Sequence, residues 1–383
     1  MKILISDKMS NKVEEVLNSK SIDFDIKTGM EPSELKSIID DYDGILIRSA
    51  TKLTSDILEN CKNLKVIGRA GVGVDNVDLD TATKNKILVM NTPLGNLEAT
   101  AELTVGLIFS LYRHIHLANK STHEGKWEKS KFMGTELKDK TLGIVGFGNI
   151  GQRVAEICKV IGMNVITNSK SATDEDLAKF NTSKVTTEQL LKDSDVLTLH
   201  TKLNDKTKNM LNKETIALMK SSAVIINCAR GGLINETDLK DCLNNDVISG
   251  AAIDVYEKEP ATENVMFGAK NLLLTPHLGA SSKEAQVNVA IDVANQVSDY
   301  LKENKIVNNL SNGEKQRVVI ARALINNPKI VIADYPENSL DSSTTKKLFF
   351  LLESLNKLGA TVIMTSKNPE MISTNYKSIV WGE

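Results

Sequence analysis

The sequence predicts an α/β protein with two lobes, each a doubly wound parallel sheet, followed by a small αβ tail. Three observations support this prediction. Short apolar runs alternate with amphipathic stretches over residues 1–280, which is typical of parallel strands covered by helices. Three glycines at GxGxxG spacing follow one of these runs and open a helical stretch. From Leu310 onward the sequence pattern changes, which indicates a separate segment.

Composition limits the classes of protein that the chain can belong to. At 383 residues, more than one domain is expected, and 41% hydrophobic with 25% charged residues is ordinary for a folded core. A formal net charge of -2 without a basic stripe makes nucleic acid an unexpected partner, and no apolar run is long enough to span a membrane. The four cysteines form no CxxC pair, so we expect reduced thiols in the cytoplasm and no metal site: Cys61, Cys158, Cys228 and Cys242.

Residues 1–95 predict the first lobe, with buried strands at 3–5, 44–47, 66–67 and 87–90. Helices are expected between them at 13–17, 35–39 and 57–58. Ligands bind at the carboxyl ends of parallel strands, and these ends carry Arg48, Arg69 and the glycine-rich 71–73. Guanidinium groups beside glycine-rich backbone predict a site for an anion, although both arginines would also suit solvated strand ends.

Residues 98–119 predict one long helix that connects the two lobes, because apolar residues recur on one of its faces. The polar stretch 125–128 that follows contains Trp127. This side chain is expected to pack on a second subunit or to cover its own core.

The second lobe is predicted to contain six strands, at 142–145, 164–167, 196–199, 223–227, 250–254 and 271–275. Gly146 permits a tight turn, Gly148 lets the backbone approach a pyrophosphate, and Gly151 lets the helix at 149–161 pack on its strand. The N-terminus of that helix offers free N–H groups to phosphates. The sequence therefore predicts a dinucleotide-binding site.

The residues after the second strand of this lobe leave the choice of dinucleotide open. NAD-binding sites usually place Asp or Glu there to bind the adenosine ribose, whereas this chain has Asn168, Ser169 and Lys170. Ser169 could bind a ribose hydroxyl, and Lys170 could neutralise a 2′-phosphate. We expect NAD, with NADP as the alternative.

Three further residues predict the chemistry. Arg230 follows a strand and can bind a carboxylate and a neighbouring carbonyl oxygen with two hydrogen bonds. His277 follows the last strand and titrates in the range that proton transfer to and from a hydroxyl requires. Glu259 could bind the other ring nitrogen and raise the pKa of the imidazole. Taken singly, His277 would also suit a turn and Glu259 a solvated surface.

Residues 1 to about 308 resemble the D-isomer-specific 2-hydroxyacid dehydrogenase family, and most closely its members that act on 3-phosphoglycerate. The resemblance rests on the GxGxxG and on a set of motifs at 48–52, 68–78, 89–93, 125–128, 131–134, 227–232 and 275–286. It implies oxidation of 3-phosphoglycerate to 3-phosphohydroxypyruvate, the first step of serine synthesis. Glyoxylate and hydroxypyruvate reductases share the catalytic residues and are the alternative.

The resemblance also implies roles for individual residues. Arg230, Glu259 and His277 form the catalytic trio. Substrate contacts are expected from Arg48, Arg69, Val72, Gly73 and Asn96. Cofactor contacts are expected from Gly146, Gly148, Asn149, Ile150, Gly151, Ser169, Cys228, Ala229, Arg230, Asp254, His277 and Gly279.

The same resemblance implies a domain organisation and a quaternary structure. A Rossmann-type cofactor domain, residues 96–282, is inserted in a flavodoxin-like substrate domain made of residues 1–95 and 283–308. The expected partners are a small 2-hydroxy acid and a second copy of the chain, which dimerises through the cofactor domain.

Residues 310–383 resemble a fragment of an ABC-transporter ATPase. Residues 310–324 match its signature segment, 329–334 its Walker B strand and 339–341 its D-loop. The chain has no GxxxxGK[ST], and Tyr335 and Lys367 stand where such ATPases place a catalytic Glu and a switch His. We therefore expect no ATP hydrolysis. The tail is either a passenger or an interaction module that contacts an intact ABC ATPase.

Overall fold

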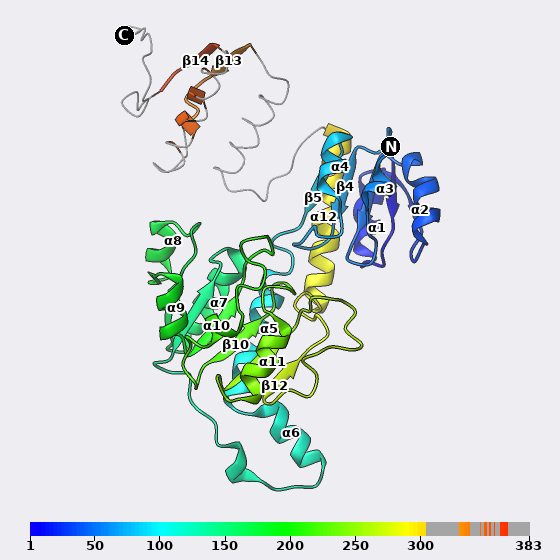
Figure 1. Ribbon diagram of the computed structural model, residues 1–383. Helices are drawn as coiled ribbons and strands as arrows, with labels where there is room; N and C mark the ends of the chain where they lie inside the picture. The colour runs from blue at the N-terminus through cyan, green and yellow to red at the C-terminus, as the bar shows by residue number, and fades with distance from the viewer. Residues whose placement is uncertain are drawn as a thin grey trace. The chain divides into compact units, whose positions relative to one another are not determined.

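The computed structural model describes residues 1–303, 329–337, 345, 348–350, 352–353, 356 and 361–366. The chain divides into two compact units, Met1–Glu303 and Asn304–Glu383, and each is described by itself (Figure 1). The first unit contains the two predicted α/β lobes. None of the helices within the described residues is both long enough and apolar enough to cross a bilayer.

The first lobe is built on a five-stranded parallel sheet with the order β2-β1-β3-β4-β5. Its strands are β1 (Lys2–Ile5), β2 (Asp23–Ile26), β3 (Gly44–Ile47), β4 (Val66–Arg69) and β5 (Leu88–Asn91). The four predicted strands are confirmed. The sequence did not predict β2, because this edge strand alternates acidic and apolar residues and none of them is fully buried. Strand order reverses between β1 and β3, where doubly wound sheets bind ligands.

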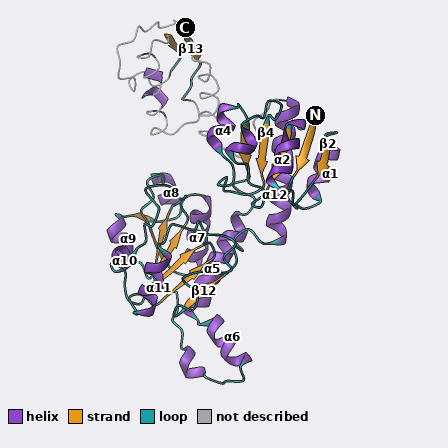
Figure 2. Cartoon of the chain, turned by 45° about the vertical axis from the view of Figure 1, so that its right-hand side comes forward, coloured by secondary structure: helices purple, strands orange, loops and turns teal. Residues whose placement is uncertain are grey.

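Helices cover both faces of this sheet (Figure 2). The helical elements are α1 (Lys12–Ser19), α2 (Pro32–Ile38), η1 (Ile39–Asp41), α3 (Ser55–Leu58), α4 (Leu79–Lys84) and α12 (Lys283–Glu303). Helices α1 and α12 share one apolar core, and α2, α3 and α4 share the other. Helix α12 comes very close to β4, because a Cβ on Gly68 would lie 2.6 Å from a methyl of Val297.

The second lobe is built on a seven-stranded parallel sheet with the order β12-β11-β10-β9-β6-β7-β8. Its strands are β6 (Thr141–Val145), β7 (Asn164–Thr167), β8 (Ser183–Lys184), β9 (Val196–Leu199), β10 (Val224–Asn227), β11 (Gly250–Ile253) and β12 (Leu272–Leu274). The six predicted strands are confirmed. The seventh, β8, has only two residues, both exposed, and therefore carries no apolar pattern. Strand order reverses between β6 and β9, at the end of the GxGxxG strand.

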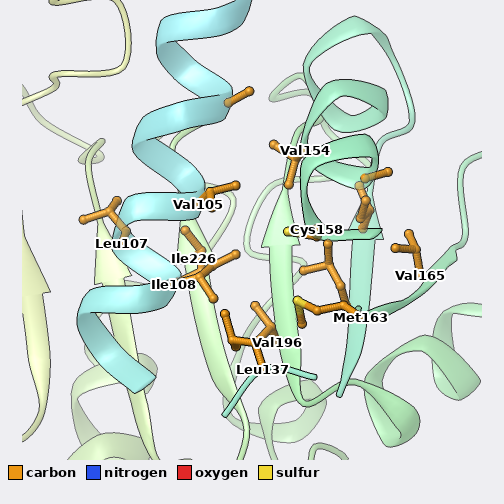
Figure 3. Packing of buried hydrophobic residues seen from close by; sticks show 14 of the residues in the cluster. Val105, Leu107, Ile108, Leu137, Val154, Cys158, Met163, Val165, Val196 and Ile226 are labelled. Carbon is orange, nitrogen blue, oxygen red and sulfur yellow. The ribbon is translucent and has the colours of Figure 1, made fainter. Parts of the chain in front are cut away.

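Apolar cores lie on both faces of the second sheet. Helices α5 (Leu97–Tyr112), α7 (Asn149–Val160) and α8 (Asp174–Lys179) pack on one face. Figure 3 shows part of this core, in which Val105 and Ile108 of α5 face strand residues such as Ile226, and Val154 and Cys158 belong to α7. Helices α9 (Thr187–Asp193), α10 (Lys213–Ile216) and α11 (Glu236–Asn244) cover the other face.

The prediction of one connecting helix over 98–119 is wrong. Helix α5 ends at Tyr112, and a second helix, α6 (Ile115–His123), begins after His114, whose φ of 51° lies in the left-handed region. A left-handed residue interrupts the helical hydrogen-bond pattern and changes the chain direction. Helix α5 is a core helix of the second lobe, whereas α6 and η2 (Lys129–Phe132) form an arm, residues 113–136, that extends from it (Figure 1).

The described part of the second unit contains two parallel strands, β13 (Ile330–Ala333) and β14 (Thr361–Met364). Val331 packs with Leu348, Phe349 and Leu352, whereas Phe350 is 69% exposed. At the strand ends, Thr365 Oγ1 donates to Asp334 Oδ1 at 2.6 Å and accepts from the backbone N–H of Tyr335. The expected signature segment, the D-loop and Lys367 lie outside the described residues.

Candidate active site

The three predicted catalytic residues follow three neighbouring strands. Arg230 follows β10, Glu259 lies on the loop after β11, and His277 follows β12 with a φ of 56°. Because β10, β11 and β12 are adjacent and parallel, their carboxyl ends meet at one edge of the sheet. His277 Nδ1 lies 2.7 Å from Glu259 Oε2. An ionised carboxylate only accepts hydrogen bonds, so Nδ1 carries the proton and Nε2 is left as the basic nitrogen.

Glu259 is also held by its own loop. Its Oε1 accepts a hydrogen bond of 3.0 Å from the backbone N–H of Tyr256. The Tyr256 hydroxyl in turn donates to the carbonyl oxygen of Thr275 at 2.9 Å, next to His277. A Cβ on Gly231 would lie 1.8 Å from the Tyr256 carbonyl oxygen, so only glycine lets this loop lie against the end of β10.

Glu236 at the start of α11 holds both ends of the loop that presents Glu259. Its Oε1 accepts from the backbone N–H of Glu257, and its Oε2 accepts from Asn264 Nδ2, each at 2.8 Å. No pattern in the sequence distinguishes Glu236, because the acidic start of a helix is explained by the helix dipole alone.

Asp254 shapes the loop that carries His277. Its side chain is fully buried, and Oδ1 accepts from Thr275 Oγ1 at 2.6 Å and from the Leu278 backbone N–H at 2.7 Å. Its Oδ2 accepts from the backbone N–H of Gly279 at 2.8 Å. Asp254 was expected to contact the cofactor, and both of its carboxylate oxygens bind the protein's own loop.

The two members of the His277–Glu259 pair shift each other's titration. The hydrogen bond from Glu259 raises the pKa of His277 above its ordinary value, although burial opposes this. Burial would raise the pKa of Glu259, but hydrogen bonds from His277 and from the Tyr256 backbone outweigh it and lower that pKa. The pair is therefore stable as imidazolium and carboxylate, which favours an imidazole that takes up a proton.

Arg230 acts electrostatically on the His277–Glu259 pair, and Arg230 and Arg48 both act on Arg69. Arg69 is mostly buried, and burial together with the charge of Arg230 lowers its pKa to about 10. Its Nε is buried and has no hydrogen-bond partner among the described residues, and the same is true of Asn96 Oδ1. Buried polar atoms are normally satisfied, so these two atoms indicate a site for a polar ligand.

Asp7 and Asn76, which no sequence motif predicted, hold the loop that carries Arg48. Asp7 accepts hydrogen bonds from the backbone N–H groups of Arg48 and Thr51 and from Thr51 Oγ1. Asn76 Nδ2 donates to the carbonyl oxygens of the same two residues, each at 2.7 Å. Asn76 lies three residues after the glycine-rich segment 71–73. This position in the sequence was the only feature that could have predicted its role in holding the loop.

The predicted glycines form a cradle at the end of β6. Gly146 has a φ of 92°, and a Cβ there would lie 2.4 Å from the carbonyl oxygen of His200. A Cβ on Gly151 would lie 2.3 Å from the Gly146 carbonyl oxygen, whereas one on Gly148 would meet nothing within 4 Å. Helix α7 begins at Asn149 and directs the N–H groups of its first turn, including that of Ile150, toward this open space. These residues fit a dinucleotide pyrophosphate.

The end of β7 presents no carboxylate. Asn168 Nδ2 donates to Thr187 Oγ1 at 3.1 Å, and the buried Ser169 Oγ lies 3.1 Å from Ser171 Oγ. Lys170 is exposed. The hydroxyl groups of Ser169 and Ser171 suit a ribose hydroxyl, and the exposed ammonium of Lys170 could reach a phosphate.

Cys228 is inert in this structure. It is buried near β10, and burial raises the pKa of its thiol to about 12. The thiol therefore stays protonated at neutral pH and acts as a small apolar group. The neighbouring Ala229 backbone N–H donates to Asn227 Oδ1 at 3.0 Å, which fixes the turn before Arg230.

The first unit of the chain is similar to known proteins. Residues 105–279 match the sequence profile of the D-isomer specific 2-hydroxyacid dehydrogenase NAD binding domain. The D-3-phosphoglycerate dehydrogenase of Synechocystis sp. is 44% identical over 300 residues, which cover 78% of this chain and 54% of that protein. The chain thus spans just over half the length of the curated relatives that it matches first.

Solved structures agree with this comparison. The PH0520 protein of Pyrococcus horikoshii is 31% identical, with a TM-score of 0.72 over 83% of this chain and 96% of that one. An NAD+-bound 3-phosphoglycerate dehydrogenase of Entamoeba histolytica is 28% identical, with a TM-score of 0.68 over 81% of this chain and 99% of that one.

Proposed function

We propose that this chain, which belongs to the D-isomer specific 2-hydroxyacid dehydrogenase family, oxidises 3-phosphoglycerate to 3-phosphohydroxypyruvate with NAD. The observation that carries this proposal is the 2.7 Å pairing of His277 and Glu259 beside Arg230. Removing two hydrogens from a carbinol carbon requires a base for the hydroxyl proton and an acceptor for the hydride.

In the proposed reaction His277 is the base. Glu259 holds the Nδ1 proton, so the lone pair of Nε2 takes the proton of the 2-hydroxyl group. The imidazolium that forms is stabilised by the Glu259 carboxylate. Arg230 binds the substrate carboxylate and the oxygen that becomes the carbonyl, which fixes the reacting carbon next to His277.

NAD, when bound, supplies the hydride acceptor. The Gly146–Gly151 turn and the first turn of α7 would hold its pyrophosphate, and Ser169 its adenosine ribose. On this proposal, Asp254 and Gly279 contribute by fixing the His277 loop near the nicotinamide end of the site.

The substrate's charged groups are assigned to the first lobe. The Val72 and Gly73 backbone takes the carboxylate together with Arg230. Arg48 and Arg69 supply positive charge for the phosphate, and the unpaired Arg69 Nε and Asn96 Oδ1 offer a donor and an acceptor to a polar ligand.

One observation favours a second candidate. The Asn168, Ser169 and Lys170 sequence in place of an acidic residue would also suit NADP and a glyoxylate or hydroxypyruvate reductase. Steady-state kinetics of the purified chain should distinguish the two. The assays would use 3-phosphoglycerate with NAD and NADP, and glyoxylate and hydroxypyruvate with the reduced cofactors. A strong preference for NADP and for the unphosphorylated acids would replace the primary proposal by the second.

The exposed apolar side chains of the arm support a homodimer. Trp127 is 89% exposed and Met133 81% exposed. Several large apolar side chains exposed on one segment are typical of a surface that a partner covers, whereas a single one is ordinary. We expect Trp127→Ala to raise the dissociation constant of the dimer at least about tenfold, as loss of a central aromatic contact usually does, measured by sedimentation equilibrium. Val160→Ala, which changes an 88% exposed side chain of α7, is the control. A monomeric wild type, or an equal effect of both variants, would contradict the dimer through the arm.

We infer that the tail takes no part in the dehydrogenase reaction. The site residues and the two parallel sheets that position them all lie in Met1–Glu303. A chain that ends after Asn309 is expected to keep kcat and KM within about a factor of two of the full chain. Its melting temperature should change by no more than a few degrees. Kinetics and calorimetry on both chains would measure this. Lost activity would show a contribution of the tail. The alternative, a contact of the tail with an intact ABC ATPase, predicts binding of that ATPase by the full chain but not by the shortened one.

We also propose a reducing compartment such as the cytoplasm, because all four cysteines are unpaired and buried.

A further inference from the structure

Asp75 lies on the glycine-rich loop after β4 in the first lobe and forms an ion pair with Arg230 of the second lobe. Arg230 Nε donates to Asp75 Oδ2 at 2.9 Å, although the two residues are 155 positions apart in the sequence. Arg230 also lies against this loop, because a Cβ on Gly73 would be only 1.8 Å from Nη2. Its Nη1 donates to the Ala229 carbonyl oxygen at 2.6 Å.

This position of Arg230 overlaps with the site assigned above to the substrate carboxylate. That site is formed by the backbone of Val72 and Gly73 on one side and by the guanidinium on the other. A Cβ on Gly73 would also lie only 2.5 Å from Asp75 Oδ2, so the Asp75 carboxylate and the guanidinium lie together beside the Gly73 backbone. Because Nε already donates to Asp75, a substrate carboxylate can take that hydrogen bond only after Asp75 has left.

The charges in this part of the site agree with the geometry. Asp75 opposes the burial and the Arg230 charge that lower the pKa of Arg69, so its carboxylate is within electrostatic reach of both guanidinium groups. Asp7, the second carboxylate that raises the pKa of Arg69, already accepts hydrogen bonds from Arg48 and Thr51, and Glu259 near Arg230 is paired with His277. Asp75 thus supplies at Arg230 the negative charge that a bound substrate would bring.

We propose that Asp75 stands in for the substrate carboxylate: it holds Arg230 against Gly73 in the free enzyme, and substrate binds by replacing it. This inference rests on the proposed function, because it takes Arg230 as the carboxylate anchor. The Asp75 side chain is 70% exposed, so after release its carboxylate can turn into water without the cost of burying an unpaired charge. Replacing Asp75 at Arg230 favours ligands that carry a carboxylate over neutral ligands. Only an anion can form a new ion pair with Arg230 in place of the one with Asp75.

The test measures binding of oxalate, a small dicarboxylate, by isothermal titration calorimetry. Asp75→Asn and Asp75→Ala are each expected to bind oxalate about two- to fivefold more tightly than the wild type, which is the range for an exposed ion pair. Asp56→Asn is the matched control, because it removes one charge from the same lobe at a side chain that is 72% exposed. Its affinity for oxalate is expected to equal that of the wild type.

Three results would overturn the proposal: unchanged or weaker binding by both Asp75 variants, an equal gain in the control, or no binding of oxalate by any of the proteins. Weaker binding would instead identify Asp75 as a residue that orients Arg230 for the substrate. The proposed function fails separately, if the wild type oxidises or reduces none of the 2-hydroxy and 2-oxo acids while the Asp75 variants still bind oxalate more tightly.

Discussion

Replacing His277 with asparagine is expected to lower kcat for 2-hydroxy acid oxidation by about 10²- to 10⁴-fold, the usual contribution of a general base. Asparagine can still donate a hydrogen bond to Glu259, but it has no nitrogen that accepts the hydroxyl proton at neutral pH. Cofactor affinity should change little, because the phosphate cradle lies at the end of β6 and not at the end of β12.

Stopped-flow or steady-state kinetics would give kcat, and quenching of protein fluorescence by NADH would give the dissociation constant of the cofactor. His123→Asn changes an exposed histidine of the arm and serves as the control. If His277→Asn lost cofactor affinity in proportion to turnover, His277 would hold the fold of the loop and would not transfer the proton.

Replacing Glu259 with glutamine is expected to lower kcat/KM by about ten- to hundredfold, the range for loss of a charged hydrogen bond, and to shift its pH dependence. The carboxylate raises the pKa of His277, so a neutral amide lowers it. Oxidation requires neutral His277, and its rate therefore rises with pH through this pKa. The rising limb of the Glu259→Gln profile should lie at lower pH than that of the wild type.

Reduction gives the opposite test, because it requires protonated His277 and its rate falls as pH rises through the same pKa. The falling limb should also move to lower pH, so the variant loses more activity in reduction than in oxidation at neutral pH. Glu263→Gln, an exposed carboxylate on the same loop, is the control and should keep the wild-type profile. Superimposable profiles for wild type and Glu259→Gln would exclude Glu259 from this role.

The strands of both sheets were largely predictable because parallel strands covered on both faces are continuous apolar runs. The exceptions have the same physical origin. Strand β2 lies at an edge with half-exposed residues, and β8 has two exposed residues. The break between α5 and α6 was missed because it depends on the left-handed backbone of His114, which the apolar pattern of 98–119 does not reveal.

The sequence by itself determined the α/β class, the glycine turn and the types of chemical group available: an imidazole, carboxylates and guanidinium groups after successive strands. The sequence also suggested that Glu259 binds a ring nitrogen of His277, and the two side chains lie 2.7 Å apart. Only the tertiary structure decided that Arg230 contacts Asp75, which is 155 positions away in the sequence. Apolar periodicity fixes local structure through burial, whereas contacts between distant loops depend on how strands are ordered and how the two lobes pack, which no local pattern encodes.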